Sequence, residues 1–146
     1  MTDLSLERVF PAPLEQVFSY ISKTENLLKW WGPEGVHIPE HTLNFEATGP
    51  WFSVMKNDAG QIFKVSGQVT HIDAPNSINL TWAWHDDADV RGDESHVTMT
   101  LTPDEDGGTR LILTHADLAN DEAAANHNEG WTSSLRKLES IVSEHA

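Results

Sequence analysis

The feature that most constrains the fold of this chain is a series of six segments in which apolar and polar residues alternate. A period of two is typical of strands with one buried face. The turns between the segments are short and rich in glycine, proline, asparagine and aspartate, so neighbouring strands are expected to pair antiparallel as a meander. The predicted strands are Thr42 to Ala47, Trp51 to Lys56, Ile62 to Ile72, Ser77 to His85, Ser95 to Thr102 and Thr109 to Ala116.

A single long helix is predicted after these strands. Asn120 or Asp121 can cap its start, and the helical pattern continues to about Val142. Because this is the only long helix predicted and its stripe is largely apolar, it must lie across the apolar face of the sheet. The stripe is formed by Ala124, His127, Trp131, Leu135, Leu138 and Val142.

The N-terminal part adds one strand and two short helices. Leu4 to Phe10 alternates like a strand, and an amphipathic stripe between Leu14 and Ile21 predicts a short helix. Thr24 can cap a second short helix over Glu25 to Trp30. We therefore predict one α+β domain over residues 1–146, with an antiparallel sheet of about six to seven strands covered by one long helix.

Composition excludes several classes of function. The 146 residues include no cysteine, which excludes disulfides, thiolate metal sites and a cysteine nucleophile. Acidic residues outnumber basic ones 23 to 9, and a surface this negative repels nucleic acid and anionic lipid. The first residues have no basic start and no apolar stretch, so no signal peptide is expected, and no apolar run approaches the roughly 20 residues of a membrane span. A cytoplasmic location without stable membrane association is expected.

Several short motifs in order along the whole chain resemble the START-like superfamily, also called SRPBCC or the birch-pollen allergen fold. The resemblance is closest to the family of the activator of heat-shock-90 ATPase homologue C-terminal domain. The motifs are Phe10-x-Ala12-Pro13, Trp30-Trp31-Gly32-Pro33, Gly49-x-Trp51, Gly67-x-Val69, Leu80-Thr81-Trp82, Gly108-Thr109-x-Leu111-x-Leu113-x-His115 and His127-x-x-Gly130-Trp131. The resemblance implies a helix-grip fold, in which a curved sheet wraps around the long helix with a cavity between them. Members of the family are similar to proteins that bind lipids, cyclise polyketides or assist chaperones.

Six tryptophans in one small domain predict either an aromatic core or a lined pocket. Methionine adapts its shape and suits the wall of an apolar site. Each candidate wall residue has the alternative role of filling the core. The candidates for ligand binding are Trp31, Trp51, Met55, Trp82, Trp84, Met99, His115, His127, Trp131 and Leu135.

His115 and His127 are the candidate catalytic residues. Strand and helix registers direct both into the space between sheet and helix, where an imidazole can bind a ligand carbonyl or act as a general base. The alternative is a pair of core histidines with satisfied hydrogen bonds. Gly130, in mid-helix, indicates a close approach of the sheet or of a ligand.

No metal site and no cofactor are expected. Pro39 disfavours a helical pair of His37 and His41, and the acidic stretch Asp86 to Glu94 lacks the glutamate that a calcium loop requires. Because standard catalytic motifs are missing, we predict binding of a small apolar or amphipathic molecule rather than catalysis. The alternatives are a cyclase- or hydrolase-like enzyme using a cavity histidine, and a co-chaperone-like module with a protein partner. The chain is expected to be a monomer or a homodimer.

Overall fold

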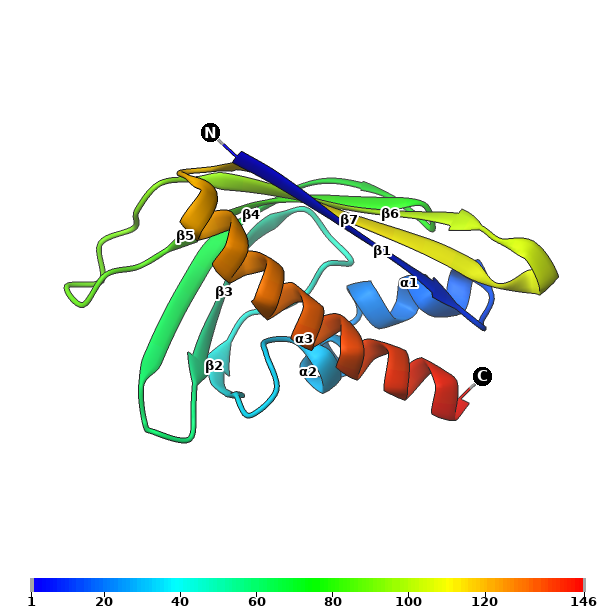
Figure 1. The fold of residues 1–146 in the computed structure, drawn as a ribbon, viewed down its shortest axis with the longest axis horizontal. Coiled ribbons are helices and arrows are strands. Elements are labelled where there is room, and N and C mark those ends of the chain that lie inside the picture. The colour runs from blue at the N-terminus through cyan, green and yellow to red at the C-terminus, as the bar shows by residue number, and fades with distance from the viewer. Residues whose placement is uncertain (1, 146) are drawn as a thin grey trace.

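The computed structural model describes residues 2–145 of the chain, which form one curved sheet, two short helices and one long helix (Figure 1). A single 3-10 turn, Glu105–Gly107, lies between the sixth and seventh strands. In chain order the elements are β1 (Thr2–Phe10), α1 (Leu14–Ser22), α2 (Thr24–Trp30), β2 (His37–His41), β3 (Gly49–Lys56), β4 (Ile62–Asp73), β5 (Ser77–Trp84), β6 (Ser95–Pro103), β7 (Thr109–Leu118) and α3 (Asp121–His145).

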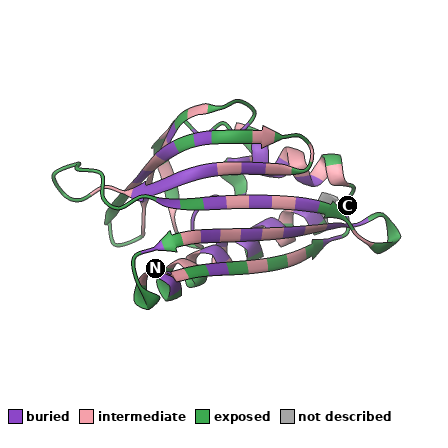
Figure 2. Cartoon of the chain, turned by 90° about the horizontal axis from the view of Figure 1, so that it is seen from above, coloured by how far each residue is buried: buried purple, intermediate pink, exposed green. Residues whose placement is uncertain are grey.

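The described residues form one antiparallel sheet of seven strands in the order β1-β7-β6-β5-β4-β3-β2. The meander from β2 to β7 follows the chain, and β1 then pairs with β7 at the far edge. Helix α3 crosses the inner face of this sheet (Figure 1). Buried and more exposed residues alternate along the strands, as expected for a sheet covered on one face (Figure 2). The predicted helix-grip fold is confirmed.

The prediction of a strand over Thr42 to Ala47 is wrong, because the strand lies earlier, at His37–His41. Leu43 and Phe45 are buried, which explains the alternation. Thr42 N–H still donates to the carbonyl of Phe52 on β3, but at Leu43 and Phe45 the backbone bonds to residues of the two short helices. Phe45 N–H donates to the carbonyl of Ser22 at 2.9 Å. The Thr24 hydroxyl donates to the carbonyl of Leu43, so Thr24 does not cap α2 as predicted.

Gly67 allows β4 and β5 to approach closely where the sheet curves. A Cβ at this position would lie 1.9 Å from the carbonyl oxygen of Thr81 on β5, a distance that no side chain can adopt. The strand register shifts a few residues further on, between Val69 and His71. Glycine in a strand often marks such a close backbone approach. The curvature that follows wraps the sheet around α3.

Helix α3 begins as predicted, with the Asn120 side chain accepting a hydrogen bond from Ala123 N–H at 2.9 Å. It extends slightly beyond the predicted end. Leu135, Leu138 and Val142 are fully buried in the core between α3, the sheet and α2. This end of the helix forms the main core, while its other end borders the site described next.

Candidate functional site

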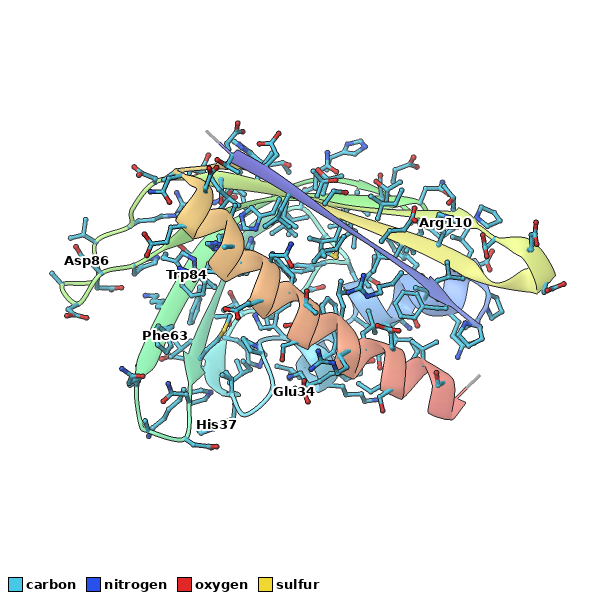
Figure 3. All side chains as sticks on the ribbon, viewed as in Figure 1. Glu34, His37, Phe63, Trp84, Asp86 and Arg110 are labelled. Carbon is cyan, nitrogen blue, oxygen red and sulfur yellow. The ribbon has the colours of Figure 1, made fainter. Side chains whose placement is uncertain are left out.

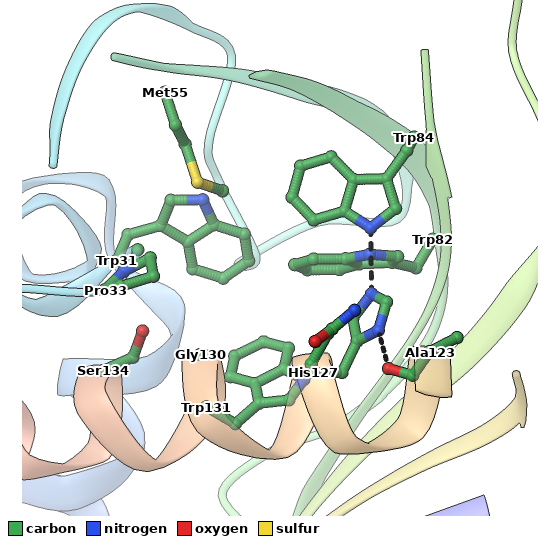
Figure 4. A pocket seen from close by; sticks show the side chains of 12 residues that line it. Trp31, Pro33, Met55, Trp82, Trp84, Ala123, His127, Gly130, Trp131 and Ser134 are labelled. Atoms are coloured by element: carbon green, nitrogen blue, oxygen red, sulfur yellow. Dashed lines mark hydrogen bonds between the residues drawn. The ribbon is translucent and has the colours of Figure 1, made fainter. Parts of the chain in front are cut away.

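A pocket of about 380 Å³ lies between the N-terminal half of α3, the strands β3 and β5, and the loop after α2 (Figure 4). Its wall comes from segments far apart in the sequence, which the curvature of the sheet brings together. None of the described residues lining it is Asp, Glu, Lys or Arg. The lining residues are Trp31, Gly32, Pro33, Met55, Trp82, Trp84, Ala123, Asn126, His127, Gly130, Trp131 and Ser134.

Four tryptophans form most of the pocket wall. Trp82 occupies the centre of the group, with ring centroids 5.2 Å from Trp131 and 5.6 Å from Trp84. The ring centroid of Trp31 is 6.0 Å from that of Trp131, and the two ring planes are nearly perpendicular. Edge-to-face pairs of this kind are favourable beyond the area they bury. The wall is therefore a packed aromatic surface that presents flat apolar faces to any occupant.

Two buried indole N–H groups, one from a wall tryptophan and one from a tryptophan behind the wall, lack a hydrogen-bond acceptor. Among the described buried side chains, Nε1 of Trp51 and Nε1 of Trp82 make no hydrogen bond. By contrast, Trp31 Nε1 donates to the Ser53 hydroxyl at 3.0 Å. A buried donor without an acceptor costs about 1–3 kcal/mol. Only Trp82 of these two unpaired tryptophans lines the pocket.

The loop after α2 forms the rim of the pocket and is fastened to α3. Gly32 has a φ of +82°, which turns the chain there, and Pro33 follows on the rim. Glu34 accepts a bond from Arg136 at 2.7 Å, and its N–H donates to the Ser133 hydroxyl at 2.7 Å (Figure 3). These contacts hold the rim against the outer side of the helix.

His127 lines the pocket, but both of its ring nitrogens are engaged. Trp84 Nε1 can only donate, so His127 Nε2 accepts this bond at 2.9 Å. The carbonyl of Ala123 can only accept, so His127 Nδ1 carries the proton and donates at 2.7 Å. These two bonds fix one neutral tautomer and leave no free lone pair to act as a base.

His115 is fully buried behind the pocket wall. Its Nδ1 accepts from Trp131 Nε1 at 3.0 Å, so Nε2 carries the proton and donates to the Ser95 hydroxyl at 2.7 Å. Burial, together with the smaller effect of the charges on His127 and His96, lowers the pKa of His115 to about 3. His115 is therefore a neutral core residue at ordinary pH.

The structure divides the predicted ligand-binding residues into two groups. Those at the pocket surface are Trp31, Met55, Trp82, Trp84, His127 and Trp131. The remaining four are buried and do not line the pocket: Trp51, Met99, His115 and Leu135. Of these, Trp51 packs against Trp31 and Trp82 from behind, at centroid distances of 5.7 and 5.6 Å.

Sequence reasoning missed the small lining residues on α3. Ala123, Asn126 and Ser134 line the pocket together with Gly130, at the helical spacing of the predicted stripe. A Cβ on Gly130 would meet only Pro33, at the ordinary contact distance of 3.8 Å. Close packing therefore does not require this glycine. Its effect is to leave space in the pocket wall, and the spacing of small residues was the signal that could have revealed it.

A second hollow of about 170 Å³ adjoins the pocket. Trp82, Trp84, Ala123 and His127 line both, so the hydrogen-bonded pair of Trp84 and His127 separates them. Among residues 2–143, whose side chains the structure describes, no three His, Asp or Glu lie close enough to hold a metal ion. No helix of this described part is long and apolar enough to cross a membrane.

Comparisons with known proteins agree with this architecture. The family model for Activator of Hsp90 ATPase homolog 1-like protein matches residues 11–143. The AHSA1 protein from Silicibacter pomeroyi is 52% identical, with 99% of this chain and 100% of that chain covered and a TM-score of 0.95. A protein from Chromobacterium violaceum, 22% identical, shares the fold with 97% of each chain covered and a TM-score of 0.82. No curated protein matches the chain.

Proposed function

The chain belongs to the Activator of Hsp90 ATPase homolog 1-like family, and on that premise we propose that it binds a small, uncharged, mainly apolar molecule in the pocket beside α3. The observation that carries the proposal is a tryptophan-walled pocket of about 380 Å³ without an acidic or basic lining side chain. Small-molecule sites are typically concave, mostly apolar and about 300–1,000 Å³ in volume.

The wall also supports a ligand that is flat in part. Aromatic faces favour planar or ring-containing molecules. The unpaired Nε1–H of Trp82 is itself buried, so the ring faces rather than this donor are what the pocket presents to a ligand. A carboxylate or phosphate would have no cationic partner in the lining.

Binding is favoured over catalysis within this pocket. A general base must offer a free lone pair within reach of the proton it removes. The ring nitrogens of His127 and His115 are already engaged with partners in the protein. An acid/base role for either histidine would first require one of these bonds to break. The open pocket likewise supports a ligand carrier more than a module that only contacts another protein.

A cytosolic location fits this role. The acidic composition and the lack of cysteine are compatible with a reducing, crowded compartment. The strong negative charge supports a carrier that does not adsorb to anionic membranes while its cargo is bound.

Native mass spectrometry of the purified protein, compared with its denatured mass, tests the proposal. We expect a reproducible extra mass that solvent extraction releases as an uncharged organic molecule. If the native mass equals that of the bare chain, and tryptophan fluorescence stays unchanged across sterols, fatty alcohols and uncharged aromatic polyketides, the carrier proposal fails. A protein partner would then be the better explanation.

A further inference from the structure

A hydrogen-bonded cluster of Ser66, His85 and Asp89 lies on the face of the sheet opposite the pocket. Ser66 Oγ is 2.7 Å from His85 Nε2, and His85 Nδ1 is 2.9 Å from Asp89 Oδ1. Successive strand residues point to opposite faces, so His85 lies on the outer side while Trp84 lines the pocket. Neither pocket described above includes any of these three residues.

The bonds determine the tautomer of His85. The carboxylate of Asp89 can only accept, so Nδ1 carries the proton and Nε2 presents its lone pair to the Ser66 hydroxyl. Lys64 lies 3.2 Å from Asp89 Oδ1, and its hydrogen bond and charge lower the pKa of this carboxyl. The carboxylate therefore stays ionised and continues to orient the imidazole. The serine proton thus points at a base, which is the arrangement of a nucleophile, a base and an orienting acid.

Arg91 adds a cation at the serine oxygen. Its Nε donates to Ser66 Oγ at 3.1 Å, and its Nη2 donates to the backbone carbonyl of Ser66 at 3.1 Å. Glu94 accepts from Nη1 at 2.9 Å and holds the guanidinium in place. A positive charge bonded to a hydroxyl oxygen stabilises the alkoxide that forms when the proton leaves.

Hydrogen bonds within the loop after β5 fix its shape, and this loop carries Asp89 and Arg91. Asp86 accepts bonds from Ala88 N–H and Val90 N–H, both at 2.9 Å (Figure 3 labels Asp86). Gly92 N–H donates to the carbonyl of Trp84 at 2.8 Å, which joins the end of the loop to the end of β5. This bracing positions Asp89 and Arg91 on either side of His85.

We propose that Ser66 is an activated nucleophile, with His85 as its general base and Asp89 as the orienting acid, that hydrolyses small, uncharged carboxylic esters. Ser66 Oγ attacks the carbonyl carbon while its proton moves to His85 Nε2. The bond from that carbon to the leaving oxygen breaks, and the leaving group takes the proton from His85. Water then attacks the acyl carbon, passes a proton to His85, and Ser66 Oγ recovers it as the acid departs.

The surroundings define the substrate class. Ser66 is only partly buried and lies on an open sheet face, which admits short acyl groups without enclosing a long chain. The carboxylates of Asp86, Asp87 and Glu94 are exposed close along the chain, so an anionic ester would be repelled. Lys64 and Arg91 are each paired with a carboxylate and do not reverse this preference.

The test uses a fluorophosphonate probe, located by peptide mass mapping, and the hydrolysis of 4-nitrophenyl acetate on the full chain. We expect labelling at Ser66, and a hydrolysis rate that falls at least about 100-fold in Ser66→Ala and in His85→Gln. Asp89→Asn should lower the rate about tenfold or more, because it loses the orienting carboxylate.

Matched controls separate the cluster from general surface reactivity. Ser5→Ala on β1 and His71→Gln on β4 replace exposed residues of the same types and should leave the rate unchanged. Urea unfolding of each variant confirms that it is folded. An unlabelled Ser66 in the wild-type chain, or labelling that proceeds at the wild-type rate in His85→Gln, would overturn the proposal.

Discussion

The two halves of α3 face the same sheet but have different roles. From Leu135 to Val142 the inward side chains are fully buried. From Ala123 to Ser134 a line of small residues runs beside the stripe, and a pocket of about 380 Å³ opens between helix and sheet. One half closes the core, and the other half is held open by its small side chains and by the tryptophans opposite.

The residues that stabilise the domain and those that line the pocket therefore lie in different halves of one helix. Large aliphatic side chains supply the burial that holds the domain together. Gly130 lowers the stability of the helix although no neighbouring atom excludes a larger side chain, and it lies in the half that borders the pocket. Substitutions in the two halves should therefore change different measurements.

The largest effect is expected in the closed half. Leu138→Ala should lower the free energy of unfolding by about 2–5 kcal/mol, because it leaves a cavity among fully buried neighbours. Urea unfolding measures the loss. Ser140→Ala, at an exposed position of the same turns, should stay within about 0.5 kcal/mol. A small loss for Leu138→Ala would show that the closed half is not the stabilising one.

The buried histidine gives the next effect, as a dependence on pH. His115 has a folded pKa of about 3 against 6.5 in the free side chain, so the unfolded state takes up more protons as the pH falls below 6.5. At pH 4.5 this group should cost about 2–3 kcal/mol of stability relative to pH 7.

His115→Gln isolates that contribution. Glutamine can accept from Trp131 and donate to Ser95 as the histidine does, but it does not titrate. Urea unfolding at the two pH values should show a smaller acid loss in the variant than in the wild-type chain. Equal losses in both would contradict a neutral, buried His115.

Gly130→Ala should move stability and binding in opposite directions. Alanine favours the helix by about 1 kcal/mol, while its methyl group takes space next to Pro33 on the pocket wall. Urea unfolding and titration with an apolar fluorophore measure the two effects. Ser140→Ala should change helix stability slightly and leave binding unchanged. Unchanged binding in Gly130→Ala would mean that the glycine does not shape the site.

The smallest effect is expected at the rim. Arg136→Ala removes an exposed ion pair with Glu34, and such pairs contribute about 0–1 kcal/mol. The loop that carries Gly32 and Pro33 would nevertheless be less well fastened to α3, so bound fluorophore should dissociate faster. Stopped-flow displacement measures this rate. A large loss of stability without faster release would contradict the role of the rim.

Periodicity predicted most of the fold because it reports which face of an element is buried. The helix period placed His127 toward the helix–sheet space, and the family resemblance placed Trp82 there, but neither could report depth within that space. His115 and Met99 are on the expected face yet lie behind the wall. Depth depends on how strands stagger and curve, which depends on contacts such as Gly67 against Thr81.

Other features were beyond any single-sequence pattern. The segment around Leu43 and Phe45 alternates like a strand because its side chains are buried, but its backbone bonds to the helical layer. Ser66 and His85 become neighbours only through the pairing of β4 with β5. Such juxtapositions need the strand register, which turn residues alone did not provide.

The most direct test of the central claim is a titration of the uncharged fluorophore N-phenyl-1-naphthylamine into three proteins: wild type, Gly130→Leu and Ser140→Leu. Leucine at position 130 would project into the pocket, whereas position 140 is exposed on the same helix. The account predicts saturable binding in the wild type and in Ser140→Leu and its loss in Gly130→Leu. No saturable binding in the wild type, or equal binding in all three folded proteins, would contradict a ligand site beside α3.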